Sequence, residues 1–291
     1  MDFLRPSSWA DALAAKAVAP TAVPIAGGTD VMVELNFDHR RPPALLDLNP
    51  VAELAEWSMA DGRIRIGAAV PYTRIITELG DRLPGLAMAS RTVGSPQIRN
   101  RGTVGGNLGT ASPAGDAHPA LLAGDAVVEV ESVRGTRMVP VAQFYTGVKR
   151  NALEPDELIA AVHIAPADGP QQFAKVGTRN AMVIAVCAFG LSLFPSTGRV
   201  GAAIGSASPT PRHATAAEDF ITGELADRWS ERKPLPDSVI RRFGEMVATA
   251  AAPIDDVRGT AAYRTHALAV LARRTLGWAW QEYREGWSAC V

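Results

Sequence analysis

The sequence predicts an α+β protein built from three consecutive units. Up to about residue 170, short strand patterns alternate with short helical ones, and the rest of the chain carries three strand patterns followed by two amphipathic helices. Of the 291 residues, 47% are hydrophobic and 20% are charged, a composition typical of globular proteins and sufficient for more than one core. We therefore expect units at 1–50, 51–170 and 171–291.

The first unit begins with a helix over 7–17. Ser7 or Ser8 can cap this helix, and Ala and Leu, which favour helices, fill its turns. A short strand should end at Gly27 and Gly28, because glycine interrupts regular patterns. The elements expected after the helix are a strand at 22–28, a helix or a strand at 30–36, and a buried strand at 44–49.

Strands and short helices alternate in the second unit. Residues 63–70 begin with alternating polar and apolar side chains, as in a half-buried strand. Pro71 suits the start of a helix, because the N–H that proline lacks has no partner there. A further helix should break at Gly94 and Pro96. The expected elements are strands at 63–70, 126–132, 136–141 and 157–164, helices at 71–79 and 119–124, and a segment at 83–100 that begins as a helix.

The third unit changes pattern at about residue 171. Its three apolar runs are typical of strands, and a PSTG turn joins the last two. The two segments that follow repeat apolar residues at three- and four-residue spacing, which indicates amphipathic helices. The expected elements are strands at 171–177, 182–194 and 199–208 and helices at 236–251 and 259–283.

Charge and cysteine content exclude several classes of protein. The formal net charge of −1 gives no reason to expect nucleic acid or an anionic membrane as a partner. No apolar run reaches the roughly 18–20 residues of a membrane helix, and the N-terminus lacks the blocks of a secretory signal. With Cys187 and Cys290 as its two cysteines, the chain has no disulfide framework, so we expect a cytoplasmic protein.

A metal site in this chain alone is not expected. An iron–sulfur cluster normally takes four thiolates, and the chain has two cysteines. The five histidines form neither an HxxxH nor an HxH pair. Redox chemistry would therefore need an organic cofactor or a partner chain.

Two glycine-containing stretches follow strand patterns: AGGTD at 26–30 and TVGGNLG at 103–109. Glycine allows main-chain N–H groups to approach a ligand closely, and adjacent amides that point the same way bind phosphate. Each stretch alone also fits an ordinary turn, and GGN fits a hairpin turn. The chain contains neither GxGxxG nor GxxxxGK[ST], which argues against the Rossmann and P-loop modes. Together, the two bends could hold a dinucleotide across a domain boundary.

At 91–130, RTVGSPQIRNRGTVGGNLGTASPAGDAHPALLAGDAVVEV closely resembles the flavin-binding block of the molybdenum hydroxylases, the family of xanthine dehydrogenase, carbon monoxide dehydrogenase and aldehyde oxidase. PIAGGTDVMVEL at 24–35 resembles the first FAD loop of that family, and FAKVGTRNAMVIAV at 173–186 resembles the start of its C-terminal domain. The resemblance extends over the length of the separate FAD-carrying medium subunit. It implies an FAD-binding domain of the vanillyl-alcohol-oxidase (PCMH) type in two subdomains, then a C-terminal α+β domain with a three-stranded sheet and helices.

The resemblance also implies which residues hold FAD. The first stretch should cradle the diphosphate, the second should form the opposite wall, and further side chains should line the pocket. The cofactor-binding residues are expected to be Pro24, Ile25, Ala26, Gly27, Gly28, Thr29, Asp30 and Val31 in the first stretch, Thr103, Gly105, Gly106 and Asn107 in the second, and Val93, Asp116, Leu153 and Lys175 elsewhere.

Several of these residues also have a structural interpretation. Asp116 precedes a helical pattern and could cap the helix while it contacts the cofactor. Lys175, taken alone, fits a solvated strand lysine, and His118 fits a structural histidine at a helix start. Some relatives place a tyrosine or an acid near the flavin where this chain has Met182 and Val183, so the resemblance leaves the covering of the flavin edge open.

The function implied is that of the electron-exit subunit of a three-component hydroxylase. A large partner would hold a molybdenum cofactor and a small partner two [2Fe–2S] clusters, in a dimer of heterotrimers. FAD suits this role because a flavin accepts single electrons and delivers a pair. The expected acceptor is NAD⁺, with quinone or O₂ as alternatives, and the expected substrate is xanthine or a related purine, with carbon monoxide, N-heterocycles and aldehydes as alternatives. The role requires no catalytic acid or base.

Two other classes of function stay open at this point. A stand-alone FAD reductase or oxidase would turn over without partners. A non-catalytic nucleotide-binding scaffold would use the same glycine bends without carrying a flavin.

Overall fold

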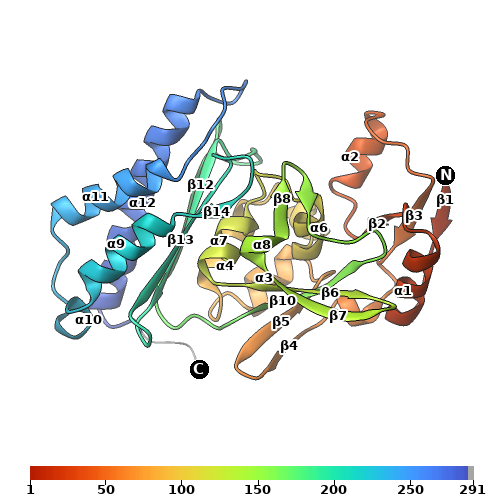
Figure 1. Cartoon of the computed structure of the whole chain (residues 1–291), viewed down its shortest axis with the longest axis horizontal. Helices are drawn as coiled ribbons and strands as arrows, with labels where there is room; N and C mark the ends of the chain where they lie inside the picture. Colours follow the sequence, from red (N-terminus) through yellow and green to blue (C-terminus); the bar gives the residue numbers. More distant parts are fainter. Residues whose placement is uncertain (288–291) are drawn as a thin grey trace.

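In the computed structural model, which describes residues 1–287, three successive units lie side by side (Figure 1). The first unit contains a parallel sheet in the order β1–β3–β2. The side chain of Ser8 caps the first helix by accepting a hydrogen bond from the main-chain N–H of Asp11. The elements of this unit are β1 (Asp2–Leu4), α1 (Trp9–Val18), β2 (Val23–Ile25), α2 (Val31–Asn36) and β3 (Ala44–Asp47).

The second unit is built on an antiparallel sheet in the order β4–β5–β10–β6–β7, and β8 pairs with β9 separately. Several of its helices lie between this sheet and the third unit (Figure 1). Its elements are η1 (Ala52–Leu54), β4 (Trp57–Ala60), β5 (Arg63–Gly67), α3 (Tyr72–Glu78), α4 (Pro84–Thr92), α5 (Pro96–Arg99), α6 (Val104–Thr110), α7 (Ala117–Ala123), β6 (Val127–Ser132), β7 (Gly135–Pro140), α8 (Val141–Phe144), β8 (Tyr145–Gly147), β9 (Arg150–Asn151) and β10 (Leu158–Ile164).

The third unit contains the three predicted strands in an antiparallel sheet, with a two-residue fourth strand, β14, at its edge. Helices α9, α11 and α12 cover one face of this sheet, and α4 and α7 of the second unit lie against the other (Figure 1). The elements are β11 (Gln171–Val176), β12 (Cys187–Phe194), β13 (Arg199–Gly205), β14 (Arg212–His213), α9 (Thr215–Leu225), α10 (Arg228–Glu231), α11 (Asp237–Thr249) and α12 (Ala261–Arg284).

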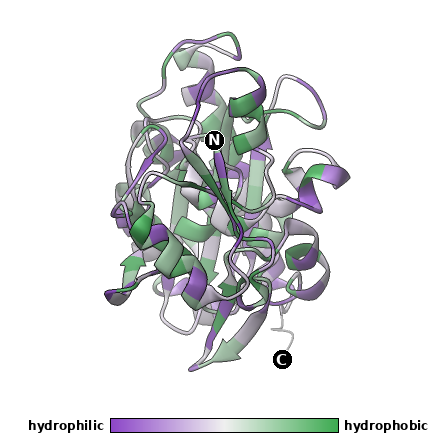
Figure 2. Cartoon of the chain, turned by 90° about the vertical axis from the view of Figure 1, so that its right-hand side faces the viewer, coloured by the Kyte–Doolittle hydropathy of each residue, from purple (hydrophilic) through white to green (hydrophobic). Residues whose placement is uncertain are grey.

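Two hydrophobic cores hold these layers together. One extends from α1 through the second unit to the inner face of the third sheet, and the other lies between that sheet and the C-terminal helices. Glycine permits the close contact between α7 and the sheet, because a Cβ at Gly201 would lie 2.2 Å from the carbonyl oxygen of Ala123. Seen from the N-terminal side, the outer helices carry both hydrophobic and hydrophilic segments (Figure 2), as expected of helices with one buried face.

The structure corrects the expected elements in three places. The segment 103–109, interpreted as a bend, is largely helix α6, because Thr103 caps it and supplies the start that its glycines disfavour. The strand expected over 182–194 begins only at Cys187, because Met182 has a φ of +50° and turns the chain. β1, β4 and α9 were not expected.

Two expectations concern the chain as a whole. None of the helices within 1–287 combines the length and the hydrophobicity that a membrane crossing requires. Cys187 is buried with a free thiol, and Cys290 lies outside the described residues. The boundaries near residues 50 and 170 remain our proposal for the division of the chain.

Candidate functional site

A cavity of about 700 Å³ lies where the three units meet. Its wall comes from the segment after β2, from α6 and the loop that follows, from 151–159, and from 182–184. All the predicted cofactor-binding residues line it except Ile25 and Lys175. Its volume falls in the range of about 300–1,000 Å³ found for small-molecule sites.

The first glycine stretch presents free main-chain amides to this cavity. The N–H groups of residues 26–31 donate no hydrogen bond to any group within 1–287. Gly28, with a φ of +74°, turns the chain between β2 and α2. Successive amides without a partner at a turn form a concave donor surface that suits phosphate oxygens. This stretch therefore has the chemistry expected for holding a diphosphate.

Gly27 brings the first stretch into direct contact with Arg101, two residues before the second stretch. A Cβ at this position would lie 1.8 Å from the carbonyl oxygen of Arg101. Asn49 secures the same junction, since its amide donates to the carbonyl of Ala26 over 2.9 Å and its oxygen accepts from Arg101 over 3.1 Å. The glycine here serves the contact between two chain segments as well as the approach of a ligand.

The main-chain amides of Gly105, Gly106 and Asn107 in the second stretch are bonded within the protein, in contrast to those of the first stretch. The N–H of Gly105 donates to the carbonyl of Ala68, and those of Gly106 and Asn107 donate to the side chain and carbonyl of Thr103. These amides are thus engaged within the protein and are not available to a ligand. The wall that α6 forms offers side chains instead.

One side-chain contact joins the two stretches, between residues that face each other. Thr110 at the end of α6 donates to the carboxylate of Asp30 over 3.0 Å. This role of Thr110 could not be predicted from the sequence, since threonine near a helix end is common.

Three buried polar atoms on the cavity wall lack a hydrogen-bond partner among the described residues: the side-chain carbonyl oxygen of Asn107, one carboxylate oxygen of Asp116, and the hydroxyl of Tyr72. Buried polar groups are nearly always satisfied, so each marks a place where a ligand or water must supply the partner. Asn107 and Asp116 were predicted from the sequence, whereas Tyr72 was not.

Asp116 does not cap the helix that follows it. Its side chain makes no capping bond, and instead accepts from the hydroxyl of Thr92 over 3.0 Å and from the ammonium of Lys175 over 2.6 Å. Burial raises the pKa of Asp116, and the charge of Lys175 opposes that rise. The expected capping role is therefore wrong, because the carboxylate bonds to Thr92 and Lys175 instead, and contact of Asp116 with the cofactor stays a prediction.

Lys175 lies behind the cavity wall. Besides Asp116, its ammonium donates to the carbonyl oxygens of Thr92 and Val183, at 2.9 and 3.1 Å. Three acceptors account for the three N–H bonds of an ammonium group. Lys175 thus fixes both Asp116 and the segment 182–184, and direct contact between Lys175 and the cofactor stays a prediction.

The segment 182–184 forms an apolar rim. Met182 and Ile184 are more than half exposed and line the cavity. The Arg179 side chain donates to the carbonyl of Met182 and stabilises the turn. The edge of the cavity at this point is therefore covered by aliphatic side chains and main chain.

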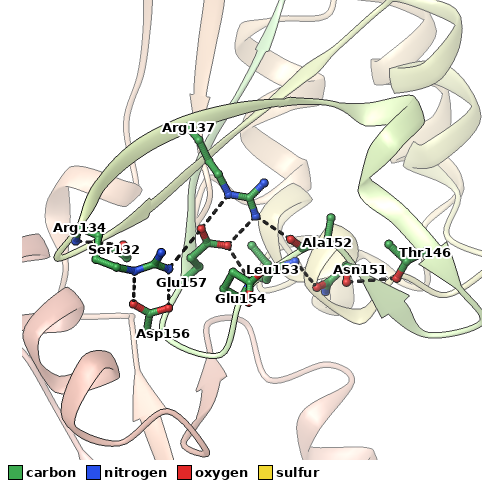
Figure 3. A network of polar contacts seen from close by, with 10 residues as sticks. All are labelled: Ser132, Arg134, Arg137, Thr146, Asn151, Ala152, Leu153, Glu154, Asp156 and Glu157. Carbon is green, nitrogen blue, oxygen red and sulfur yellow. Dashed lines mark hydrogen bonds and ion pairs between the residues drawn. The ribbon is translucent and has the colours of Figure 1, made fainter.

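The loop 152–157, which carries Leu153, is fixed by a polar network (Figure 3). The guanidinium of Arg137 donates to both carboxylate oxygens of Glu157 and to the carbonyl of Ala152, over 2.6–2.7 Å. Glu157 in turn accepts from the main-chain N–H of Glu154. Hydrogen bonding to Arg137 holds the pKa of Glu157 below its usual range. The network keeps Leu153 at the cavity wall.

His118 has the structural role that the sequence indicated. It is buried, does not line the cavity, and one ring nitrogen lies 2.7 Å from the hydroxyl of Tyr145. Burial lowers the pKa of His118 to about 3, so the ring is neutral near pH 7. No group of three potential metal ligands occurs among residues 1–287.

The residues present fit FAD. The free amides of 26–31 suit the diphosphate, the unpartnered oxygens of Asn107 and Asp116 suit hydroxyl or ring N–H donors, and the rim at 182–184 suits an apolar ring edge.

Comparison with known proteins gives the same result. Residues 1–167 match the family model described as the FAD binding domain in molybdopterin dehydrogenase, and residues 172–279 match the CO dehydrogenase flavoprotein C-terminal domain. The xanthine dehydrogenase FAD-binding subunit of Escherichia coli O157:H7 is 32% identical over 282 residues, covering 94% of this chain and 93% of the relative. The nicotinate dehydrogenase FAD-subunit of Eubacterium barkeri is 36% identical over 218 residues, or 70% of this chain and 72% of the relative.

Among solved structures, the carbon monoxide dehydrogenase of Hydrogenophaga pseudoflava superimposes with a TM-score of 0.88 at 25% identity, over 97% of both chains. The chain therefore belongs to the FAD-binding medium subunits of the molybdenum hydroxylases, oxidoreductases of the xanthine dehydrogenase family, and has their FAD-binding domain of the vanillyl-alcohol-oxidase (PCMH) type followed by their C-terminal flavoprotein domain.

Proposed function

We propose that this chain carries electrons from [2Fe–2S] clusters of a small partner subunit to NAD⁺, within a complex whose large subunit holds a molybdenum cofactor and hydroxylates xanthine or a related purine. The observation that carries the proposal is the cavity between the two glycine stretches, with its row of free amides. We infer the partners from the relatives, which are named as subunits. A dimer of heterotrimers is the assembly we expect.

Within the cavity, we propose that the amides of 26–31 hold the diphosphate and that Asn107 and Asp116 orient the rest of the cofactor. When bound, FAD supplies the conversion between single-electron donors and a two-electron acceptor. The protein residues bind and orient the cofactor and keep water from its apolar edge. The chain has two cysteines, fewer than the four thiolates that one iron–sulfur cluster normally takes, which supports the assignment of the clusters to a partner.

We assign xanthine or a related purine as the substrate because the xanthine dehydrogenase subunit combines 32% identity with a match over 94% of this chain. The relatives also include proteins named for nicotinate and for carbon monoxide. The substrate pocket would lie in the large subunit, so the assignment has to be tested on the complex.

The test uses the assembled complex, purified through a tag on this chain and kept without oxygen. Xanthine, nicotinate and carbon monoxide are added separately while the flavin absorbance is followed. The proposal predicts that xanthine bleaches the flavin and that NAD⁺ restores its colour with formation of NADH. Bleaching by nicotinate or carbon monoxide alone would contradict the purine assignment, and recovery with quinone or O₂ alone would contradict the NAD⁺ assignment.

A further inference from the structure

Tyr72 is a buried tyrosine whose hydroxyl has no partner in the protein. It is the first residue of α3 and is 2% exposed, and its side chain lines the cavity. Its hydroxyl makes no hydrogen bond to any group of residues 1–287. Because a buried hydroxyl without a partner destabilises a fold, its presence here indicates that something outside the chain satisfies it.

Tyr145 provides a comparison within the same molecule. It is buried like Tyr72, but its hydroxyl lies 2.7 Å from a ring nitrogen of His118, and the residue does not line the cavity. The fold thus satisfies the hydroxyl of one buried tyrosine internally and leaves that of the other, which lines the cavity, without a partner.

The ring of Tyr72 lies at the junction of the two glycine stretches. Its main-chain N–H donates to the carbonyl of Gly102 over 3.0 Å. A Cβ built on Gly102 would lie 3.5 Å from the Tyr72 ring and 3.6 Å from the hydroxyl oxygen of Thr29. Tyr72 is therefore close to the first stretch, where the free amides are found.

The electrostatic surroundings keep this hydroxyl protonated. Burial raises the pKa of Tyr72 well above 10, and the negative charges of Asp116 and Asp30 raise it further. A neutral phenol is a hydrogen-bond donor, and no group of residues 1–287 accepts a hydrogen bond from this hydroxyl. An acceptor oxygen brought by a ligand can supply the missing partner.

We propose that Tyr72 is a further cofactor-binding residue, whose hydroxyl donates a hydrogen bond to the diphosphate of FAD at the junction of the two stretches. The inference rests on the proposed position of FAD in this cavity. It does not depend on the identity of the substrate, the electron acceptor or the partner subunits.

The test compares Tyr72→Phe with the matched control Tyr145→Phe in the full-length chain, since each variant removes one buried hydroxyl and keeps the ring. FAD affinity is measured by titration of the flavin-free protein, and stability without ligand by urea unfolding. Tyr72→Phe should weaken FAD binding by roughly tenfold or more while the unfolding midpoint stays equal or rises. Tyr145→Phe should lower the midpoint and leave FAD affinity unchanged.

Phosphorus NMR of bound FAD locates the contact. The proposal predicts that the diphosphate signals shift in Tyr72→Phe and not in Tyr145→Phe. Unchanged FAD affinity in Tyr72→Phe would overturn the proposal, as would reduced affinity with unshifted diphosphate signals, which would place the contact elsewhere on the cofactor. If wild-type protein failed to bind FAD, the proposed site itself would be rejected, an outcome distinct from these.

Discussion

The contact between the two glycine stretches can be tested with Gly27→Ala. The new Cβ would lie 1.8 Å from the carbonyl oxygen of Arg101 and 2.4 Å from its carbonyl carbon. Both are main-chain atoms, so no change of rotamer relieves the clash, and one stretch must move by roughly 1.5–2 Å to restore ordinary van der Waals contact. Such a shift exceeds the tolerance of a hydrogen bond of about 2.7–3.2 Å.

The expected loss of FAD affinity follows from the hydrogen bonds that this shift would break. Losing two amide bonds to a charged phosphate, at about 1.5 kcal/mol each, should weaken FAD binding about a hundredfold. Crowding the junction should also lower the free energy of unfolding by about 1–3 kcal/mol. FAD titration and urea unfolding of the full chain measure the two effects separately.

Gly223→Ala in α9 is the matched control. A Cβ there meets no atom within 4 Å, and alanine favours a helix over glycine. We expect Gly223→Ala to raise the free energy of unfolding by about 0.5–1 kcal/mol and to leave FAD affinity unchanged. If Gly27→Ala bound FAD as tightly as the wild type, the two stretches would not form one cofactor site and the reasoning would be refuted.

Three further predictions concern residues around the cavity. The pKa of His118 is about 3 in the folded chain and about 6.5 in the unfolded chain, so protons bind the unfolded state first as the pH falls. The free energy of unfolding should therefore fall by up to about 1.4 kcal/mol per pH unit between these two values. His118→Gln should flatten that slope in urea unfolding, and an unchanged slope would argue against a buried neutral ring. Arg137→Ala should lower the free energy of unfolding by about 1–2 kcal/mol and weaken FAD binding. Arg134→Ala removes a more exposed ion pair and should lower the free energy of unfolding by clearly less; equal losses in the two variants would contradict the assigned network. Lys175→Met should raise the pKa of Asp116 further, so that the folded state holds a proton that the unfolded state loses above about pH 4. The free energy of unfolding should then fall more steeply than in the wild type as the pH rises above this value, and parallel pH profiles would rule out the ion pair as the main control of Asp116.

The position of the site could be predicted from sequence because glycine leaves a local signal. Gly27, Gly28 and the pair Gly105 and Gly106 stand out beside hydroxyl and amide residues, and all four line the same cavity in the structure. The roles of the single glycines could not be predicted, since a sequence does not show whether a main-chain N–H is bonded within the protein or free for a ligand. Only the folded chain shows that Gly105 and Gly106 donate within the protein.

The residues that sequence reasoning missed depend on contacts across the fold. Tyr72 follows a proline in an apolar segment and looks like an ordinary core residue. The expected contact of Lys175 with FAD stays a prediction, but the sequence could not show its three acceptors, which come from α4, from the loop before α7 and from 182–184. Helix α6 could not be predicted because the glycines at 105, 106 and 109 have low helix propensity, and propensity does not include the stabilising cap at Thr103.

The most direct test of the central claim is a crystal structure of the full chain with FAD bound. The account predicts diphosphate oxygens within about 2.7–3.2 Å of the main-chain nitrogens of residues 26–31. A diphosphate held away from these amides, or a flavin outside the cavity between the two stretches, would contradict it.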